Sequence, residues 1–279
     1  MPTTHILLID CPDRKGLVHK ITGVLYQNNL NIISNNEFVD RETGHFFMRT
    51  EFSGEYAKTH LMDELHSALG CEICIRLSEK QKKNIVLMVT KEHHCLGDLL
   101  LRHEYERLNA RILSVISNYD VLRSLVEKFN IPFHCIPHDG MQREEHEAKI
   151  LRVLGDYNPE YIVLAKYMRI LTPNMVNLYA NRIINIHHSF LPAFIGANPY
   201  RQAYERGVKI IGATAHFVNG NLDEGPIIAQ NVIPVDHTQS AEDMMQAGKD
   251  VEKVVLARAL KLAFEDRIFV NGNKTIIFD

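Results

Sequence analysis

From residue 84 onward, short apolar segments alternate with segments whose apolar residues recur at helical spacing. The apolar segments lie at 85–90, 111–117, 161–165, 182–186 and 208–217. Each is apolar along almost its whole length, as is typical of strands that are covered on both faces. Because parallel strands need long crossover connections, strands of this kind separated by helices favour a parallel sheet. The pattern therefore predicts a mostly parallel α/β domain, which ends in a long helix at about 240–263.

The first eighty residues follow a different pattern. Four strand candidates lie at 4–10, 31–39, 45–52 and 71–77. Two segments between them have apolar residues at helical spacing, namely Leu17, Val18, Ile21, Val24 and Leu25 in one and Leu61, Leu65 and Leu69 in the other. The resulting order, β-α-β-β-α-β, is the ferredoxin-like arrangement. A polar segment at 78–84 is typical of a linker, so we expect two domains, at 1–80 and 84–279.

Charge and hydropathy exclude several classes of protein. The chain has 31 Lys and Arg against 34 Asp and Glu, a net charge of −3, which gives no strong attraction to nucleic acid or anionic membranes. The longest aliphatic run, at 85–89, is far shorter than the ~20 apolar residues of a membrane-spanning helix. Residues 1–5 lack the basic start of a secretory signal. We therefore expect a cytoplasmic protein without nucleic-acid or membrane partners.

The cysteines and histidines do not form a recognisable metal motif. Five cysteines, an odd number, favour reduced thiols. Cys71 and Cys74 form a C-x-x-C, but residues three apart on a predicted strand face opposite sides of the sheet. No second pair follows at zinc-ribbon spacing, and the 15 histidines include no H-E-x-x-H. We therefore expect no metal and no cofactor.

The turn that joins the first strand to the first helix, residues 10–17, contains a glycine and reads Asp-Cys-Pro-Asp-Arg-Lys-Gly-Leu. Such a turn exposes backbone N–H groups at a helix N-terminus, which suits a carboxylate. With the strand order, it resembles the ACT domain, a small regulatory module that often binds amino acids. The resemblance implies an amino-acid effector near Asp10, Asp13, Gly16 and Leu17, and side-by-side pairing into a homo-oligomer. Alternatively, Gly16 only lets the chain turn and the domain only dimerises.

Polar and ionisable residues occur at the ends of three strands in the larger domain, where ligands of parallel α/β sheets bind. The segments are 165–171, 184–192 and 212–226. Within them, the amide of Asn185 can donate a hydrogen bond to an oxyanion, and His187 can polarise a carbonyl or move a proton. Asp223 can orient that histidine and help to activate a nucleophile. The plain alternative is that Asn185 caps a turn, His187 is a hydrogen-bonded core residue and Asp223 belongs to a surface turn.

The run Asn-Ile-His-His-Ser-Phe-Leu-Pro at 185–192, followed by His-Phe-Val at 216–218 and Leu-Asp-Glu-Gly-Pro at 222–226, resembles the formyltransferase family, which uses 10-formyltetrahydrofolate. The resemblance spans roughly residues 84–279 and includes Met-Arg-Ile-Leu at 168–171. It implies catalytic roles for Asn185, His187 and Asp223. It also implies that the folate, held largely by backbone groups, is bound around Met168, Arg169, Leu171, His216, Asn219 and Gly220.

Three departures bear on the acceptor of the formyl group. Transferases that act on glycinamide ribonucleotide have a glycine-rich phosphate loop after their first strand, whereas residues 90–98 here contain one glycine, two adjacent histidines and two acids. His188 stands where those transferases usually have proline, and an ACT-like domain precedes the catalytic one. This combination is similar to the formyltetrahydrofolate deformylases.

That similarity implies hydrolysis of 10-formyltetrahydrofolate to formate and tetrahydrofolate, which supplies formate for purine biosynthesis and balances one-carbon pools. Asn185 and His187 would stabilise the formyl oxyanion, while Asp223 orients His187 and helps to activate water. Folate is then the substrate and not a cofactor. Two alternatives remain: a folate-dependent formyltransferase with an unidentified amine acceptor, and a non-catalytic sensor of amino acids or folate. The role of His188 and the identity of an effector stay open.

Overall fold

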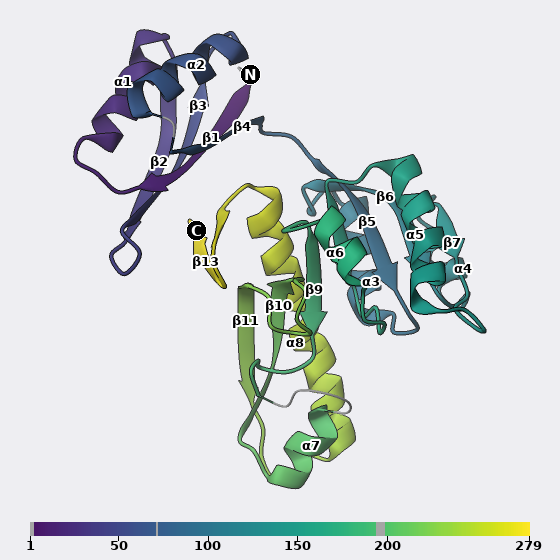
Figure 1. Cartoon of the computed structure of the whole chain (residues 1–279). Coiled ribbons are helices and arrows are strands. Elements are labelled where there is room, and N and C mark those ends of the chain that lie inside the picture. The colour runs from purple at the N-terminus through teal and green to yellow at the C-terminus, as the bar shows by residue number, and fades with distance from the viewer. Residues whose placement is uncertain (1–2, 71, 194–198) are drawn as a thin grey trace. The chain divides into compact units, whose positions relative to one another are not determined.

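The computed structural model describes residues 3–70, 72–193 and 199–279 (Figure 1). The chain divides into two compact units. One comprises residues 1–81 with 276–279, and the other comprises residues 82–275.

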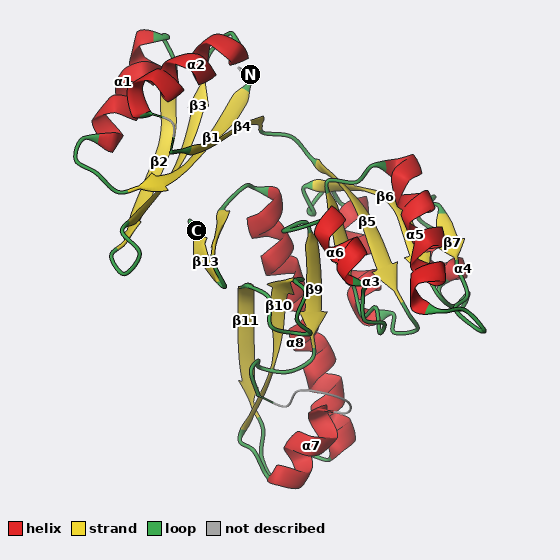
Figure 2. Ribbon diagram, viewed as in Figure 1, coloured by secondary structure: helices red, strands yellow, loops and turns green. Residues whose placement is uncertain are grey.

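The first unit has the expected β-α-β-β-α-β order. Its elements are β1 (Thr4–Pro12), α1 (Leu17–Gln27), β2 (Asn31–Asp40), β3 (His45–Ser53), α2 (Lys58–Leu69) and β4 (Cys74–Glu79). The strands form an antiparallel sheet in the order β2-β3-β1-β4. Both helices lie on one side of this sheet (Figure 2). The prediction of a ferredoxin-like fold is confirmed.

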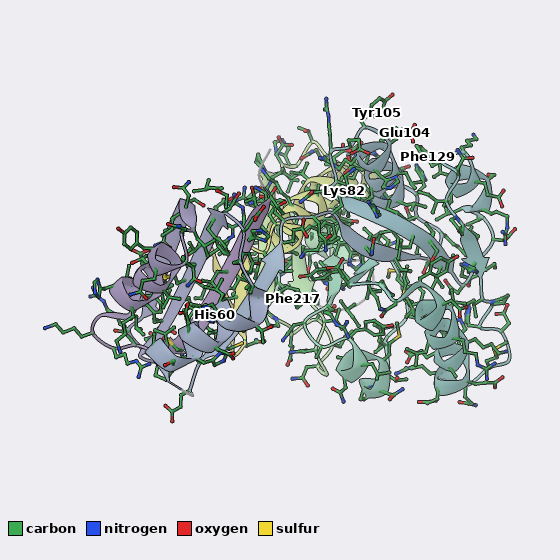
Figure 3. All side chains as sticks on the ribbon, turned by 90° about the horizontal axis from the view of Figure 1, so that it is seen from above. His60, Lys82, Glu104, Tyr105, Phe129 and Phe217 are labelled. Carbon is green, nitrogen blue, oxygen red and sulfur yellow. The ribbon has the colours of Figure 1, made fainter. Side chains whose placement is uncertain are left out.

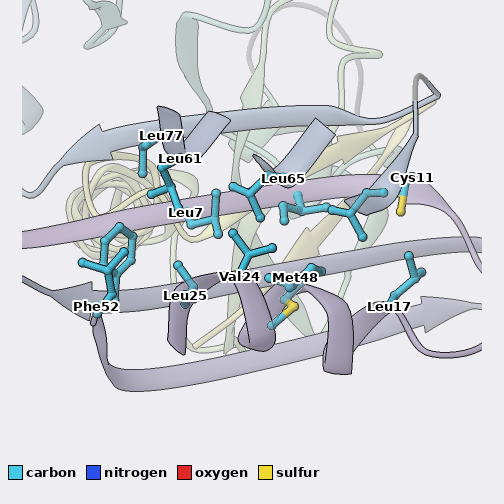
Figure 4. Close-up of a cluster of buried hydrophobic side chains, with 14 of the residues drawn as sticks. Leu7, Cys11, Leu17, Val24, Leu25, Met48, Phe52, Leu61, Leu65 and Leu77 are labelled. Carbon is cyan, nitrogen blue, oxygen red and sulfur yellow. The ribbon is translucent and has the colours of Figure 1, made fainter. Parts of the chain in front are cut away.

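The core of the first unit lies between the two helices and the sheet (Figure 4). Leu17, Ile21 and Leu25 of α1 recur at helical spacing and are buried there, as predicted. Leu61 and Leu65 of α2 meet them from the second helix, each with 0% exposure. Close packing of these side chains fixes both helices on the same face of the sheet.

The boundary between the units differs from the prediction. The strand expected at 71–77 is β4, Cys74–Glu79, and Cys71 lies outside the described residues. The linker expected at 78–84 is shorter, because β5 already begins at Lys83. Lys83 is only 6% exposed, and its Nζ lies 2.9 Å from Oδ2 of Asp266. A lysine that is buried through an ion pair looks like a linker residue in the sequence, which explains the error.

The second unit contains a seven-stranded sheet in the order β11-β10-β9-β8-β5-β6-β7. Its strands are β5 (Lys83–Val89), β6 (Ala110–Ser117), β7 (Phe133–Cys135), β8 (Tyr161–Leu164), β9 (Ile183–His187), β10 (Ile210–Phe217) and β11 (Ile227–Pro234). Its helices are α3 (His94–Glu104), α4 (Arg123–Glu127), α5 (Arg143–Tyr157), α6 (Pro173–Leu178), α7 (Pro199–Arg206) and α8 (Ala241–Phe264). A separate hairpin of β12 (Ile268–Asn271) and β13 (Lys274–Ile277) follows.

Five neighbouring strands, from β9 to β7, are parallel, and β10 and β11 are antiparallel to their neighbours. The prediction of a mostly parallel sheet is therefore confirmed. Val86 and Met88 of β5 join α5 and α6 in one buried cluster. The alternate residues of β5 are also buried, so the sheet is covered on both faces. Helices α3 and α8 contact each other and pack along the sheet.

The β10–β11 hairpin brings the loop at 218–226 to the sheet face that carries Asn185 and His187, two residues apart on β9. Because β10 runs antiparallel to β9, its last residue, Phe217, lies beside Ile184 near the start of β9. The loop must therefore turn back over the sheet face to reach His187. The site thus lies over this face, and not only at the strand ends as expected.

Candidate functional site

Asn185, His187 and Asp223 come together in the structure. Nδ1 of His187 lies 3.3 Å from Oδ1 of Asp223, which the loop after β10 supplies. The His187 side chain is buried, and its Nε2 has no hydrogen-bond partner among the described residues. Because Nδ1 faces the carboxylate, Nε2 is left for a ligand. This is the arrangement of an oriented histidine with one nitrogen held and the other available.

His216 lies next to this pair on β10 and orients the amide of Asn185. Its Nδ1 lies 2.8 Å from the carbonyl oxygen of Phe217, which is labelled in Figure 3. A carbonyl only accepts, so Nδ1 carries a proton and Nε2 of the neutral ring is an acceptor. Nδ2 of Asn185 lies 3.2 Å from that Nε2 and donates to it. One amide N–H of Asn185 is thereby committed, and the other is left for a ligand.

Asp223 is ionised at neutral pH. Burial alone raises its pKa, but its contacts with His187 and His216 outweigh burial and lower the pKa well below its ordinary value. Its φ is 56°, in the left-handed region that aspartate tolerates better than most residues. The loop therefore presents a fixed negative charge to His187.

A pocket of about 410 Å³ opens beside these residues, and we call it the main pocket. Its walls are the segment after β8, the face of β9 and the loop after β10. All six residues expected at the folate site line it, namely Met168, Arg169, Leu171, His216, Asn219 and Gly220. Met168, Ile170 and Leu222 expose apolar side chains there, with 60%, 48% and 57% exposure. An apolar rim with a few convergent polar groups suits a flat, partly polar ring.

The wall formed by residues 166–172 is held from outside the pocket. The backbone N–H of Met168 donates to Oγ1 of Thr90, at 2.9 Å. At the other end, buried Glu147 accepts from the backbone N–H of Thr172 at 2.8 Å and from its hydroxyl. These hydrogen bonds hold the backbone at both ends of the segment. The N–H and C=O groups between them are therefore preorganised for a ligand.

A buried ionic cluster that no sequence motif indicates lies next to the main pocket. Glu252 of α8 is 0% exposed and is surrounded by three partners: Nε2 of His94 at 2.8 Å, the hydroxyl of Tyr200 at 2.7 Å and Nζ of Lys166 at 3.3 Å. Burial raises the pKa of Glu252, but the hydrogen bonds and the lysine charge bring it down to about 2. We call these four residues the Glu252 cluster.

The cluster borders a second pocket of about 560 Å³, which shares Lys166, Met168 and His188 with the main pocket. Glu92, from the segment at 90–98 that lacks a glycine-rich loop, also lines it and pairs with Lys249 at 2.9 Å. One feature of the sequence does indicate a buried charge here. Glu252 interrupts the apolar face of the long C-terminal helix, and a charge there needs a buried partner.

His94, Cys95 and Glu252 place one possible metal-ligand atom each within 4.8 Å of one another. The donor set does not suit a metal, because Glu252 already holds the ammonium of Lys166. A thiol must also lose its proton to bind a metal, and burial raises the pKa of Cys95 far above its ordinary value. The carboxylate of Glu252 is instead neutralised by Lys166 and hydrogen-bonded to His94.

The residues expected at an effector site lie in the first unit. Gly16 caps the N-terminus of α1 with a φ of 88°, and Oδ1 of Asp10 lies 3.3 Å from Nε2 of His45 on β3. Asp13 is exposed. The side chain of Leu17 is 3% exposed and belongs to the core, so only its backbone is left for a ligand. Across the described residues, no helix has the length and apolarity needed to cross a membrane.

Family models match both units. The ACT domain matches residues 5–68, and the formyl transferase family matches residues 83–260. The formyltetrahydrofolate deformylase of Haemophilus influenzae is 60% identical over 272 residues, which are 98% of each chain.

Solved structures agree with this similarity. A formyltetrahydrofolate deformylase from Pseudomonas syringae is 43% identical, with a TM-score of 0.96 over 100% of this chain and 95% of that chain. A glycinamide ribonucleotide transformylase from Symbiobacterium toebii is 32% identical, with a TM-score of 0.67, and covers 71% of this chain and 94% of its own. Full-length similarity thus extends to the deformylases, while the transformylase matches only part of the chain. The chain belongs to the formyltetrahydrofolate deformylase family.

Proposed function

We propose that this chain hydrolyses 10-formyltetrahydrofolate to formate and tetrahydrofolate. The observation that carries the proposal is the unpartnered Nε2 of His187, which is buried at the wall of the main pocket between Asn185 and Asp223. The family supports the same reaction, because relatives that match the whole chain have the name formyltetrahydrofolate deformylase. Supplying formate for purine biosynthesis and balancing one-carbon pools is the proposed use of this reaction.

In the proposed mechanism, the formyl group lies against His187 with the folate ring in the main pocket. The free amide N–H of Asn185 and the Nε2–H of protonated His187 donate hydrogen bonds to the negative charge that develops on the formyl oxygen. Asp223 orients His187, stabilises its protonated form and helps to activate the attacking water. The departing nitrogen, N10, is an aryl amine whose lone pair is delocalised, so it needs only a proton to leave.

A formyltransferase is the second candidate, because the transformylase from Symbiobacterium toebii shares the fold of the larger unit. A transferase needs a place for an acceptor amine next to the formyl group. The second pocket offers space there, but the relatives that match the whole chain have the name formyltetrahydrofolate deformylase, whereas the transformylase matches only part of it. We therefore favour water as the acceptor.

We further propose that the first unit binds an amino-acid effector at the turn before α1 and pairs with a second copy in a homo-oligomer. Gly16 at the helix N-terminus supports the first part, and the exposed edge strand β2 supports the second. Effector binding would couple to the active site through a shared free energy. The odd number of cysteines still predicts reduced thiols and a cytoplasmic location.

The first test is formate release from 10-formyltetrahydrofolate in the absence of any amine. We expect continuous turnover by the natural chain and a loss of at least ~100-fold in His187→Ala, as for removal of a general acid–base group. Asp223→Asn should also lower turnover while tetrahydrofolate still binds, because it changes the partner of His187 and leaves the rest of the pocket intact.

The control is His134→Ala on β7, which removes a histidine at the far edge of the sheet from β9. It should retain turnover. Folate binding without formate release in the natural chain would contradict hydrolysis, and acceptor amines would then be tried.

A further inference from the structure

His188 is the residue that borders both the main pocket and the second pocket immediately beside His187. Its ring meets the ring of His187 edge to face, with centroids 5.0 Å apart and an angle of 78°. On its other side it contacts the ring of Tyr200, with centroids 6.2 Å apart. Neither ring nitrogen of His188 has a hydrogen-bond partner among the described residues. A half-buried imidazole with free nitrogens therefore faces the space next to the reacting group.

The surroundings keep this imidazole neutral. Burial, the ammonium of Lys166 and the neighbouring His187 lower the pKa of His188 to about 4, while the carboxylates of Glu252 and Asp223 oppose them. Lys166 is held in place by Glu252, at 3.3 Å. At neutral pH, His188 thus offers a nitrogen lone pair that can accept a hydrogen bond from water.

The residues already assigned to the site leave the proton of the attacking water without a clear destination. Oδ1 of Asp223 already faces Nδ1 of His187 at 3.3 Å and Nε2 of His216 at 3.7 Å, so this carboxylate is held by two imidazole rings. His187 has to meet the formyl oxygen through Nε2, and His216 is committed to Asn185. A further proton acceptor is needed on the side from which water arrives.

We propose that His188 is a catalytic residue of the hydrolysis, which binds the attacking water from the side of the second pocket and takes its proton. This inference rests on the proposed function. Folate fills the main pocket when its formyl group reaches His187, so water reaches the formyl carbon from the adjoining pocket that His188 borders. In this position, His188 would direct the reaction toward water as the nucleophile.

The water oxygen forms a bond to the formyl carbon, one water proton passes to the free nitrogen of His188, and the carbonyl electron pair moves to the formyl oxygen. When the intermediate collapses, the bond from carbon to N10 breaks and its electron pair stays on N10. The His188 imidazolium, a strong acid in this environment, returns its proton to N10. Tetrahydrofolate and formic acid leave, and the acid loses its proton to solvent.

The test compares His188→Ala, His188→Gln and His134→Ala in the full-length chain. We expect formate release to fall by at least ~100-fold in both His188 variants, while tetrahydrofolate binds with less than about a threefold change in Kd. Imidazole added to His188→Ala should restore turnover in proportion to its neutral form, because the second pocket gives it access. His134→Ala should keep its turnover and gain nothing from imidazole.

The pH profile gives an independent readout. The acidic limb of turnover should follow His188 in the natural chain and move to the higher pKa of imidazole, ~7, in the rescued variant. Turnover of His188→Ala within about threefold of the natural chain would overturn the proposal. A loss that imidazole does not restore, in a variant that still binds tetrahydrofolate, would overturn it as well. Both results are distinct from failure of the proposed function, in which the natural chain itself releases no formate.

Discussion

Glu252 carries a fully buried charge in the second unit. A fully buried carboxylate is costly unless it is paired, and here one carboxylate serves Lys166, His94 and Tyr200 together. Lys166 has a φ of 65°, a conformation that non-glycine residues rarely adopt, so its position is determined by its surroundings as much as by its backbone. The cluster fixes the wall between the two pockets.

We expect Glu252→Gln to lower the free energy of unfolding by about 3–5 kcal/mol at pH 7, because it leaves the Lys166 ammonium buried without its countercharge. Lys166→Met in the same chain should recover part of that loss. Urea unfolding of the two variants and the natural chain measures both effects. Equal midpoints for the natural chain and Glu252→Gln would contradict the assignment.

The pH dependence of this effect has a definite sign. The pKa of Glu252 is about 2 in the folded chain and 4.5 in its ordinary state, so the folded form binds the proton less readily. Its contribution to stability is present in full above about pH 4.5 and is lost as the pH falls toward 2. The difference between the natural chain and Glu252→Gln should therefore shrink on acidification.

Among the elements, the loop after β10 decides whether the site forms at all. It turns back over the sheet because Gly225 lets two backbone segments approach closely. A Cβ built at this position would lie 1.8 Å from the carbonyl oxygen of Phe217 and 3.3 Å from Nδ1 of His216. Backbone cannot yield to such a contact, so the glycine is required by close approach and not by its φ.

Gly225→Ala should therefore displace the loop and withdraw Asp223 from His187. We expect turnover to fall at least tenfold, since ~1 Å of misplacement can cost about 10²-fold in rate. The matched control is Gly155→Ala in α5, where a Cβ meets nothing within 4 Å. Formate release and thermal unfolding of both variants provide the measurement, and unchanged turnover in Gly225→Ala would show that the loop accommodates the methyl group.

The elements also show how far the sequence is informative. Strands β5, β6, β8, β9 and β10 are apolar nearly throughout, so their hydrophobic runs predict them closely. Strand β11 was missed because it is an edge strand, with the polar pair Gln230 and Asn231 in its middle. Strand β7 has three residues, too few for a periodic pattern. A strand at the edge of a sheet, or one of only a few residues, lacks the hydrophobic pattern by which buried strands are predicted from sequence.

At the candidate site, too, the sequence predicts the residues that belong to local motifs but not the contacts between distant segments. Asn185, His187 and Asp223 stand in motifs, so the sequence predicts them, and the structure places them together. Glu252 and His94 are separated by 158 residues and meet only because α3 and α8 contact each other in the fold. No local pattern connects two residues so far apart. Their pairing is a property of tertiary structure, and so is the position of His188 between the two pockets.

At the scale of the whole molecule, the edge of the first sheet is open. Strand β2 is exposed along most of its length and pairs only with β3 in the described sheet. Ile33 and Phe38 on this strand are 52% and 45% exposed. An exposed edge strand with apolar side chains is a template for pairing with another chain. It is the surface on which the proposed oligomer depends.

Phe38→Glu should convert the oligomer to a smaller species, because the introduced charge would be buried at the paired edge. Light scattering gives the mass of the natural chain and the variant. Tyr105→Glu is the control, since Tyr105 follows α3 in the second unit, does not belong to the first sheet and is 70% exposed. A monomeric natural chain, or a variant of unchanged mass, would contradict pairing through β2.

The buried cysteines have a practical consequence for the two units. Cys11 in the first unit is 1% exposed, and Cys95 at the start of α3 in the second is 0% exposed. Burial raises the pKa of both thiols, which keeps them protonated and slow to react. An alkylating reagent therefore modifies each only during a local opening of its own unit. The alkylation rates of Cys11 and Cys95 therefore report the opening rates of the first and the second unit separately. Peptide mass spectrometry measures both rates in a single sample.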